Sequence, residues 1–220
     1  MRILAIDVGG SHVKCAVSTS SRRARFRSGP ELTAARMAKG VLEMTEGWRF
    51  DRVAIGYPGV VQRGRIVKEP HNLGPGWVGF DFRAAFKCPV RIINDAAMQA
   101  LGDYHGGTML FLGLGTGLGS ALIADGTIVP LELAHLHCSA RHDYEHFLGE
   151  RGRRRLGDGK WRRRVREVVE EFRAAFLPEY VVIGGGNARR LKRLPAGTRR
   201  GRNSNALLGG FRIWGPKAPR

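Results

Sequence analysis

The chain has 220 residues, enough for one domain or for two small lobes, and its 43% hydrophobic and 25% charged residues are ordinary for a globular protein. It has no long apolar run, no signal-peptide pattern and no CxxC pair among its three cysteines, which excludes a membrane-spanning protein and a disulfide framework and predicts a cytoplasmic location. The net charge of +18 favours polyanionic partners such as nucleic acid, an acidic membrane or a long phosphate chain, although an arginine-rich proteome produces the same balance.

The first part of the chain alternates β-rich runs with one helical stretch. Residues 3–8 (ILAIDV) and 13–17 (VKCAV) are β-rich and joined by GGSH, which predicts a hairpin. A basic, serine-rich loop is expected over 18–28 and a helix over 31–46. The run RVAIGYPGVV is typical of a buried strand that enters a Pro-Gly turn.

The next part begins at a strand-to-helix junction. The run VRIINDAAMQALGDYHG indicates a strand, a polar break and then a helix, with Asp95 where an N-cap residue would lie. In TMLFLGLGTGLGSALIADGTIV we expect a strand, a glycine turn, a strand and a second hairpin at Asp125-Gly126. The spacing of apolar residues in WRRRVREVVEEFRAAFL predicts a helix over 161–177, and YVVIGGG predicts a last short strand. Hairpins mixed with crossover helices place the chain in the α/β class.

Three strands run into glycine-rich turns, within DVGGS (7–11), GTGLG (115–119) and GGG (184–186). Glycine lets backbone N–H groups approach a phosphate closely, but each turn alone also fits a plain change of direction. None matches the consensus sequence of a P-loop. The run GLGTGLG is expected between two strands, whereas a dinucleotide-binding fingerprint lies at the start of a helix. Two glycine hairpins together with a strand-end aspartate form a more specific pattern.

Several motifs follow one another along nearly the whole chain: IDVGGSHVK, GYPGVV, HNLGPGWVG, INDA, LGTGLGSA, LELAH and VVIGGG. On these motifs the chain resembles the ROK family of sugar kinases, in the actin-like ATPase superfamily, and most of all its polyphosphate glucokinase branch. The resemblance implies an α/β, two-lobed actin-like ATPase (ribonuclease H-like) fold with a cleft between the lobes. It divides the chain into an N-terminal lobe over 1–100 and a C-terminal lobe over 101–220, whose tail is free to pack back on the N-terminal lobe.

The resemblance also assigns roles to individual residues. Asp95 would be the general base that takes the proton of the attacking sugar hydroxyl. Contacts to the sugar would come from Pro58, Gly59, Asn72, Asn94, Glu132 and His135. The phosphoryl donor would be held by Asp7, Gly9, Gly10, Ser11, Lys14, Gly115, Thr116, Gly117 and Gly119, with Gly184, Gly185 and Gly186 on the nucleotide side. Asp7 would also lie near Mg²⁺ or its waters, since this ion prefers a few carboxylates plus phosphate oxygens.

The implied activity is transfer of a phosphoryl group from polyphosphate, ATP or both to the 6-hydroxyl of glucose, by a homodimer. The chemistry of the residues agrees, because phosphoryl transfer needs mainly positioning, charge neutralisation and one carboxylate oriented toward the nucleophile. Taken alone, Asp95 also fits a plain helix N-cap, and Lys14 a strand residue that faces solvent. His135 alone also fits a structural histidine, and Glu132 a surface acid.

The sequence departs from the family pattern in the sugar and metal motifs. Ser11 replaces the usual threonine and keeps the hydroxyl, whereas Ala134 replaces a glycine, which bears on sugar identity more than on kinase activity. Many members carry a zinc site made of one histidine and several cysteines. Because only one thiol is present in that region, we expect no zinc site at His137, Cys138, His142 and His146.

The arginine-rich run over 151–166, RGRRRLGDGKWRRRVR, has two interpretations: a positive track for linear polyphosphate, or a solvated helix face with an arginine-rich loop. Other functions stay open: an ATP-dependent kinase of another hexose such as mannose or fructose, a sugar-responsive transcriptional regulator, and a non-catalytic sugar- or nucleic-acid-binding descendant. A regulator of this family carries an added helix-turn-helix, which we do not expect here because the first predicted strand begins at Ile3. Asp95 and both glycine hairpins argue against a non-catalytic descendant, while the positive charge leaves nucleic acid open as a partner.

Overall fold

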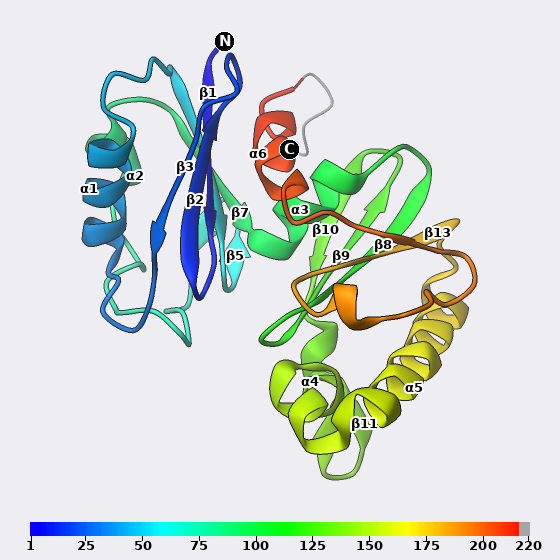
Figure 1. Ribbon diagram of the computed structural model, residues 1–220. Coiled ribbons are helices and arrows are strands. Elements are labelled where there is room, and N and C mark those ends of the chain that lie inside the picture. Colours follow the sequence, from blue (N-terminus) through cyan, green and yellow to red (C-terminus); the bar gives the residue numbers. More distant parts are fainter. Residues whose placement is uncertain (216–220) are drawn as a thin grey trace. The chain divides into compact units, whose positions relative to one another are not determined.

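The structure is a computed structural model that describes residues 1–215, and the chain forms two compact units (Figure 1). The first unit comprises Met1–Gly102 together with residues 206–215, and the second comprises Asp103–Asn205. Each unit is built around one five-stranded sheet with helices packed on it, so the predicted α/β class is confirmed. None of the helices in the described part of the chain combines the length and the apolar character that crossing a membrane requires.

The sheet of the first unit has the strand order β3-β2-β1-β4-β7. Its strands are β1 (Ile3–Val8), β2 (His12–Val17), β3 (Arg23–Arg27), β4 (Arg52–Tyr57) and β7 (Val90–Asn94). The other elements are α1 (Ala34–Met44), the hairpin of β5 (Val61–Gln62) and β6 (Arg65–Ile66), α2 (Phe82–Phe86), α3 (Asp95–Asp103) and α6 (Asn205–Arg212). Neighbours among β1, β2 and β3 are antiparallel, whereas β1, β4 and β7 run parallel and therefore end at the same edge of the sheet.

Helices α1 and α2 cover one face of this sheet, and α6 covers the other (Figure 1). The side chains of α1 that are buried repeat at helical spacing: Ala34, Met37, Ala38 and Val41. On the opposite face, the small side chains of Ala5 and Ala16 leave room for Leu207 of α6. Gly210 lets α6 approach closely, because a Cβ at this position would lie 2.7 Å from that of Ala5.

The sheet of the second unit has the order β10-β9-β8-β13-β14. Its strands are β8 (Thr108–Leu114), β9 (Leu118–Ala124), β10 (Thr127–Leu131), β13 (Tyr180–Gly184) and β14 (Thr198–Arg200). The other elements are the 3₁₀ helices η1 (Leu133–His135) and η2 (Ala188–Arg190), the hairpin of β11 (His137–Ser139) and β12 (His142–Asp143), α4 (Tyr144–Leu148) and α5 (Glu150–Phe176). The turn between β9 and β10 has positive φ at both Asp125 and Gly126, as the predicted two-residue hairpin requires.

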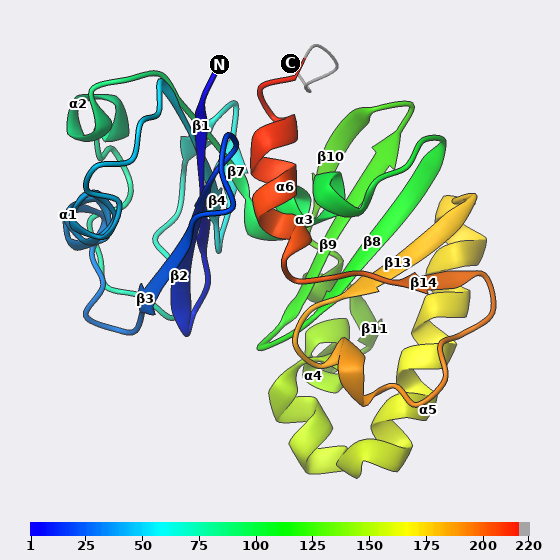
Figure 2. The ribbon, with the colours of Figure 1, turned by 45° about the horizontal axis from the view of Figure 1, so that its top comes forward.

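Helix α5 belongs to the second unit (Figure 2), and its side chains supply much of the core of that unit. Its buried side chains follow the predicted helical spacing: Trp161, Val165, Val168, Val169 and Phe172. They belong to one hydrophobic cluster with residues of β8 and β13. The helix bends at Gly157, whose φ of 75° and ψ of 155° are not helical, and it is followed by Leu177 in the left-handed conformation. The helix predicted over 161–177 is thus confirmed.

Two expectations for loops are wrong. The loop expected over 18–28 contains strand β3, because its arginines alternate with Ala24 and Phe26, and Phe26 packs against the core. The arginine-rich loop considered for 151–166 is absent, since the run lies within α5 and departs from helical geometry only at Gly157.

Candidate active site

The first glycine turn, residues 9–11, joins β1 to β2. The N–H of Gly9 donates to the carbonyl of His12 at 3.0 Å, and a Cβ at Gly9 would lie 3.2 Å from the same oxygen. Ser28, which follows β3, donates from its hydroxyl to the carbonyl of Gly9 at 2.6 Å and from its N–H to the carbonyl of Ser11 at 3.1 Å. The turn is therefore tight and held from two sides, which fixes the direction of its backbone groups as a phosphate-binding turn requires.

Asp7 and Lys14 lie opposite each other on β1 and β2, beside this turn. Lys14 donates from Nζ to Oδ2 of Asp7 at 3.0 Å, and Asp7 is only 8% exposed. Lys14 is thus the partner of a buried carboxylate rather than a residue that merely faces solvent. Asp7 offers a single carboxylate, which fits an Mg²⁺ ion held chiefly by the phosphates of a donor.

The junction of β7 and α3 lies where parallel strands end. The side-chain amide of Asn94 donates to the carbonyl of Gly59 at 3.1 Å, and its Oδ1 accepts from the N–H of Ala97 at 3.1 Å. Asn94 is therefore the N-cap, and the expectation that Asp95 occupies that position is wrong. Asp95 is the first residue of α3 and accepts from the N–H of Ala96 at 2.8 Å. Asp95 thus interacts with the first turn of α3 without being its N-cap.

The segment that carries Asn72 lies against the first glycine turn, since a Cβ at Gly10 would be 3.9 Å from the Cβ of Asn72. Trp77 anchors this segment: its indole N–H donates to the carbonyl of Gly74 at 2.9 Å, and its ring is buried. Glu69, which sequence reasoning missed, accepts from the backbone N–H of Trp77 at 3.1 Å. The HNLGPGWVG motif thus has a structural anchor beside the candidate sugar contact.

The second glycine turn, residues 115–117, joins β8 to β9. The N–H of Gly115 donates to the carbonyl of Gly117 at 3.0 Å, and the carbonyl of Thr116 accepts from the N–H of Glu150 at 3.0 Å. Gly149 permits this approach, because a Cβ there would lie 2.9 Å from the carbonyl oxygen of Thr116. The beginning of α5 therefore supports the turn.

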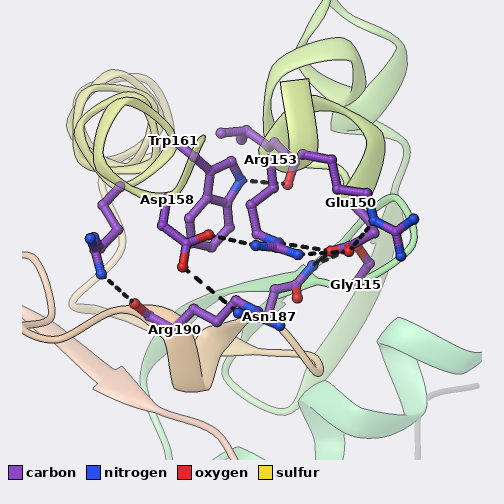
Figure 3. A network of polar contacts seen from close by, with 10 residues as sticks. Gly115, Glu150, Arg153, Asp158, Trp161, Asn187 and Arg190 are labelled. Carbon is purple, nitrogen blue, oxygen red and sulfur yellow. Dashed lines mark hydrogen bonds and ion pairs between the residues drawn. The ribbon is translucent and has the colours of Figure 1, made fainter. Parts of the chain in front are cut away.

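Asn187 connects the second glycine turn to the late glycine motif (Figure 3). Its side-chain amide donates to the carbonyl of Gly115 at 3.2 Å and to Oε2 of Glu150 at 2.9 Å. Its backbone N–H donates to the carbonyl of Leu114 at 2.9 Å. Gly185, with a φ of 81°, passes so close to the backbone of Leu114 that a side chain would overlap it. Sequence reasoning identified both glycine motifs but neither Asn187 nor Glu150, which link them.

Four charged side chains surround this link (Figure 3). Arg153 donates to both carboxylate oxygens of Glu150 at 2.8 and 2.9 Å, and Arg154 donates to one of them at 2.8 Å. Arg153 also donates to Asp158 at 2.5 Å, and Arg190 lies 3.7 Å from the other oxygen of Asp158. These hydrogen bonds hold the pKa of Glu150 well below its ordinary value, and the bond from Arg153 lowers the pKa of Asp158. Part of the arginine-rich run thus supports the second glycine turn.

A pocket of about 240 Å³ opens beside the late glycine motif. It is lined by Gly185, Gly186, Ala188, Arg189, Arg200, Gly201 and Asn203. Arg200 is fixed there by hydrogen bonds from its guanidinium to the carbonyl of Ala188 and, at 2.8 Å, to that of Leu191. Together with the exposed Arg189, it gives the pocket a positive charge, which suits an anionic ligand.

Glu132 precedes η1 and His135 is its last residue, and Nε2 of His135 lies 3.9 Å from Oε2 of Glu132. At least half of each side chain is exposed and available to a ligand. Ser120 positions this segment, because its hydroxyl oxygen accepts from the N–H of Leu133 at 3.2 Å. Ala134, where the family pattern has glycine, is 2% exposed, so its extra methyl group lies inside the fold and not toward a ligand.

The histidines considered for zinc lie in and after the β11–β12 hairpin. The rings of His142 and His146 have centroids 4.0 Å apart, and the thiol of Cys138 donates to the carbonyl of His142 at 3.4 Å. Burial and the nearby Arg155 lower the pKa of His146. Within residues 1–215, no three His, Cys, Asp or Glu side chains gather as a metal site requires.

The predicted residues therefore form separate clusters within the two units. Asp7, Lys14 and Asn72 lie around the first glycine turn. Asn94, which directly precedes Asp95, is hydrogen-bonded to Gly59 of the Pro-Gly turn. In the second unit the second glycine turn and the late glycines come together, whereas Gly119 lies inside β9, where it pairs with Gly113.

Two units that each carry a glycine turn between the first antiparallel strands of a mixed sheet define the actin-like ATPase fold class. The model of the ROK family matches residues 3–130, which is more than half of the chain, and the chain belongs to this family. The resemblance drawn from the motifs is thereby confirmed.

The chain is similar to several sugar kinases over most of its length. The polyphosphate glucokinase of Mycobacterium tuberculosis H37Rv is 28% identical over 207 residues, which cover 84% of this chain and 77% of the relative. The polyphosphate glucokinase of Mycobacterium leprae is 26% identical, over 87% of this chain and 65% of the relative. The solved structure of an inorganic polyphosphate/ATP-glucomannokinase from Arthrobacter sp. strain KM matches with a TM-score of 0.81 and 26% identity, over 95% of this chain and 96% of that one. These similarities support an enzyme of the glucokinase type.

Proposed function

We propose that this chain transfers a phosphoryl group to the 6-hydroxyl of glucose, with inorganic polyphosphate, ATP or both as donor. The observation that carries the proposal is the β7–α3 junction, where Asn94 caps the helix and binds the carbonyl of Gly59 while Asp95 follows directly. The relatives named polyphosphate glucokinase and polyphosphate/ATP-glucomannokinase support glucose as the sugar and both polyphosphate and ATP as candidate donors.

Asp95 would act as the general base and accept the proton of the attacking hydroxyl. One of its oxygens already accepts from the N–H of Ala96 at 2.8 Å, which orients the carboxylate. A base oriented in this way contributes typically ~10²–10⁴-fold to a rate. The sugar would be oriented by Pro58, Gly59, Asn72, Asn94, Glu132 and His135.

The glycine turns would hold the donor through backbone N–H groups that already point in fixed directions. The first turn would contribute Gly9, Gly10 and Ser11, and the second Gly115, Thr116 and Gly117, with Gly119 behind it in β9. For ATP, the pocket beside Gly184, Gly185 and Gly186 would take the nucleotide side.

Mg²⁺ bound with the donor's phosphates supplies neutralisation of the charge that develops on them. Asp7 would hold this ion through its waters, and Lys14 orients the Asp7 carboxylate from 3.0 Å.

Phosphorylation of mannose is a second candidate, because the Arthrobacter relative is named a glucomannokinase. The buried methyl group of Ala134 lies between Glu132 and His135 in the chain and would alter their backbone relative to the usual glycine. Assembly into a homodimer and binding of nucleic acid stay predictions.

The proposal is tested by a coupled assay for glucose 6-phosphate with Mg²⁺ and glucose, run separately with ATP and with polyphosphate. Wild type is compared with Asp95→Asn and with the matched control Asp125→Asn, at a turn whose positive φ asparagine also adopts. Turnover that is lost in Asp95→Asn and kept in Asp125→Asn supports the proposal. No turnover with either donor, across glucose, mannose and fructose, would overturn it.

A further inference from the structure

Strand β3 presents a row of arginines on one face of the first sheet. Arg23, Arg25 and Arg27 are exposed, while Ala24 and Phe26 between them are half-buried. Phe26 packs against the core of the first unit, which fixes the side of the sheet to which the arginines point. Figure 2 shows β3 at the edge of the sheet, with β2 between it and β1.

The neighbouring strand adds one further cation, Lys14, to this face. In the register of β2 and β3, Lys14 lies opposite Arg25, so that two side chains of like charge are direct cross-strand neighbours, and His12 lies opposite Arg27. The one acid in this part of the sheet, Asp7, is engaged by Lys14 at 3.0 Å. Like charges placed opposite each other are destabilising, and an anion bound on this face would offset that cost.

The guanidinium groups of β3 differ from those of α5 in their partners. Within residues 1–215, the side chains of Arg23, Arg25 and Arg27 form no hydrogen bond, ion pair or ring contact, and residues 18–30 contain no Asp or Glu. In α5, by contrast, acids of the same helix engage arginines, as Glu150 engages Arg153 and Arg154 and as Glu167 engages Arg163 and Arg164. In the part of the chain that the structure describes, none of the three guanidinium groups of β3 has an acid partner, whereas acids engage four cations of the longer arginine-rich run.

The row of arginines leads to the first glycine turn. Ser28, directly after Arg27, donates from its hydroxyl to the carbonyl of Gly9 and from its N–H to that of Ser11. At about 3.4 Å per residue, Arg23 lies roughly 14 Å further along the strand than Arg27. A ligand that reaches from the turn to Arg23 must be long, linear and anionic.

We propose that Arg23, Arg25 and Arg27 form a track that binds the distal phosphates of a linear inorganic polyphosphate chain whose reacting end lies at the first glycine turn. This inference rests on the proposed function for the role of the turn. The regular alternation of cations along an extended strand matches a polymer that carries negative charge at every unit. The triphosphate of ATP is too short to extend from the turn along the whole of β3.

The test compares a track variant with a control of equal charge. The track variant carries Arg23→Gln, Arg25→Gln and Arg27→Gln. The control carries Arg49→Gln, Arg83→Gln and Lys87→Gln, three exposed cations of the same unit. Binding of long-chain polyphosphate, of tripolyphosphate and of single-stranded DNA to the full chain is measured by titration calorimetry at several salt concentrations, without glucose. The KM values for long-chain polyphosphate, ATP and glucose are measured alongside.

We expect the track variant to bind long-chain polyphosphate about tenfold more weakly than wild type, with a proportional rise in its KM. The slope of log affinity against log salt should decrease by about two, as expected when three cations no longer release counterions from a single-stranded polyanion. Binding of tripolyphosphate and the KM values for ATP and glucose should stay within about twofold, and the control should behave as wild type.

If the control bound long-chain polyphosphate as weakly as the track variant, the proposed track would be overturned, because the loss of net charge alone would then explain the weaker binding. Unchanged binding in the track variant would also overturn it and would leave the arginines as charges that protect a sheet edge from pairing. DNA bound as tightly as polyphosphate, and lost in the same variant, would assign the face to nucleic acid instead. If wild type phosphorylates no sugar, the proposed function fails, while the calorimetry still decides whether the track binds polyphosphate.

Discussion

The side-chain amide of Asn187 lies 2.9 Å from a carboxylate oxygen of Glu150 and 3.2 Å from the carbonyl oxygen of Gly115. One amide group thus joins the loop after β13, the start of α5 and the second glycine turn. Glu150 in turn binds the carbonyl of Thr116 through its backbone N–H at 3.0 Å. The geometry of the turn therefore depends on contacts that are remote from it in sequence.

Replacing Asn187 with alanine should raise the KM for the phosphoryl donor about tenfold and leave the KM for glucose within about twofold. The reason is that the hydrogen bonds to Gly115 and Glu150 are lost, and one hydrogen bond to a charged group is worth about 1.5–3 kcal/mol. Steady-state kinetics with both substrates varied measures the split, and Lys192→Ala, an exposed change in the same loop region, is the control. A rise in both KM values together would contradict a local role in donor binding.

The ionic network around Glu150 should make the free energy of unfolding depend on pH in the acid range. Hydrogen bonds from Arg153 and Arg154 lower the pKa of Glu150 in the folded chain from an ordinary value of 4.5. A lowered pKa means that this stabilisation is fully present above the unfolded pKa and is lost as pH falls below about 4.5 toward the folded pKa. Asp158, whose pKa Arg153 lowers, acts in the same direction.

Urea denaturation between pH 3 and pH 7 checks this dependence. Wild type should lose stability as the pH falls, and Glu150→Gln should show a flatter profile with lower stability near neutral pH. Glu46→Gln, at an exposed position of the first unit, should follow the wild-type profile. Identical profiles for Glu150→Gln and wild type would show that the network does not contribute.

On the proposed role of Asp95 as the general base, its substitution by asparagine should lower kcat by at least about 10²-fold, because an amide cannot accept the proton of the attacking hydroxyl. The KM for glucose and the thermal midpoint should change little, since Asn94, and not Asp95, caps α3. Steady-state kinetics and thermal denaturation of the same preparation give both quantities. A large fall in the thermal midpoint would indicate a structural role for the carboxylate.

Gly209→Ala should destabilise the first unit by about 1–3 kcal/mol, because a Cβ there would overlap the carbonyl oxygen of Met98 in α3 and push α6 away. Equilibrium denaturation in urea measures the change. Gly159→Ala is the matched control, since this glycine of α5 has open space around its position and alanine favours a helix by roughly 0.5–1 kcal/mol. Equal stability of Gly209→Ala and wild type would mean that α6 is not closely packed on α3.

Features that depend on local pattern could be predicted from the sequence. The apolar positions of α5 repeat at helical spacing, and the turns at residues 9–11, 115–117 and 125–126 follow from glycine after a β-rich run. Strand β3 could not be predicted from the sequence, because Ala24 and Phe26 are the only apolar residues among its arginines. The neighbouring serines are typical of a loop. The strand forms because it pairs with β2, and the local sequence pattern does not indicate this pairing.

Long-range hydrogen bonds decided the remaining features of the candidate site. Asn94 and Asp95 are both good N-cap residues, but only the amide can also donate to the carbonyl of Gly59, so the structure places Asn94 in the capping position. The Glu150–Asn187 bond joins residues far apart in sequence, and no periodicity or spacing indicates it. The motifs could therefore identify the glycine turns but not the side chains that hold them.

Helix α6 belongs to the first unit although the whole second unit precedes it in the chain. During synthesis, Ala5 and Ala16 on one sheet face stay uncovered by Leu207 until about a hundred residues have been added after Gly102, which takes roughly 5–20 seconds at ribosomal speed. The second unit, continuous in sequence, is complete before that moment. The nascent first unit is thus the part of this protein that exposes an apolar surface longest on the ribosome and offers it to chaperones.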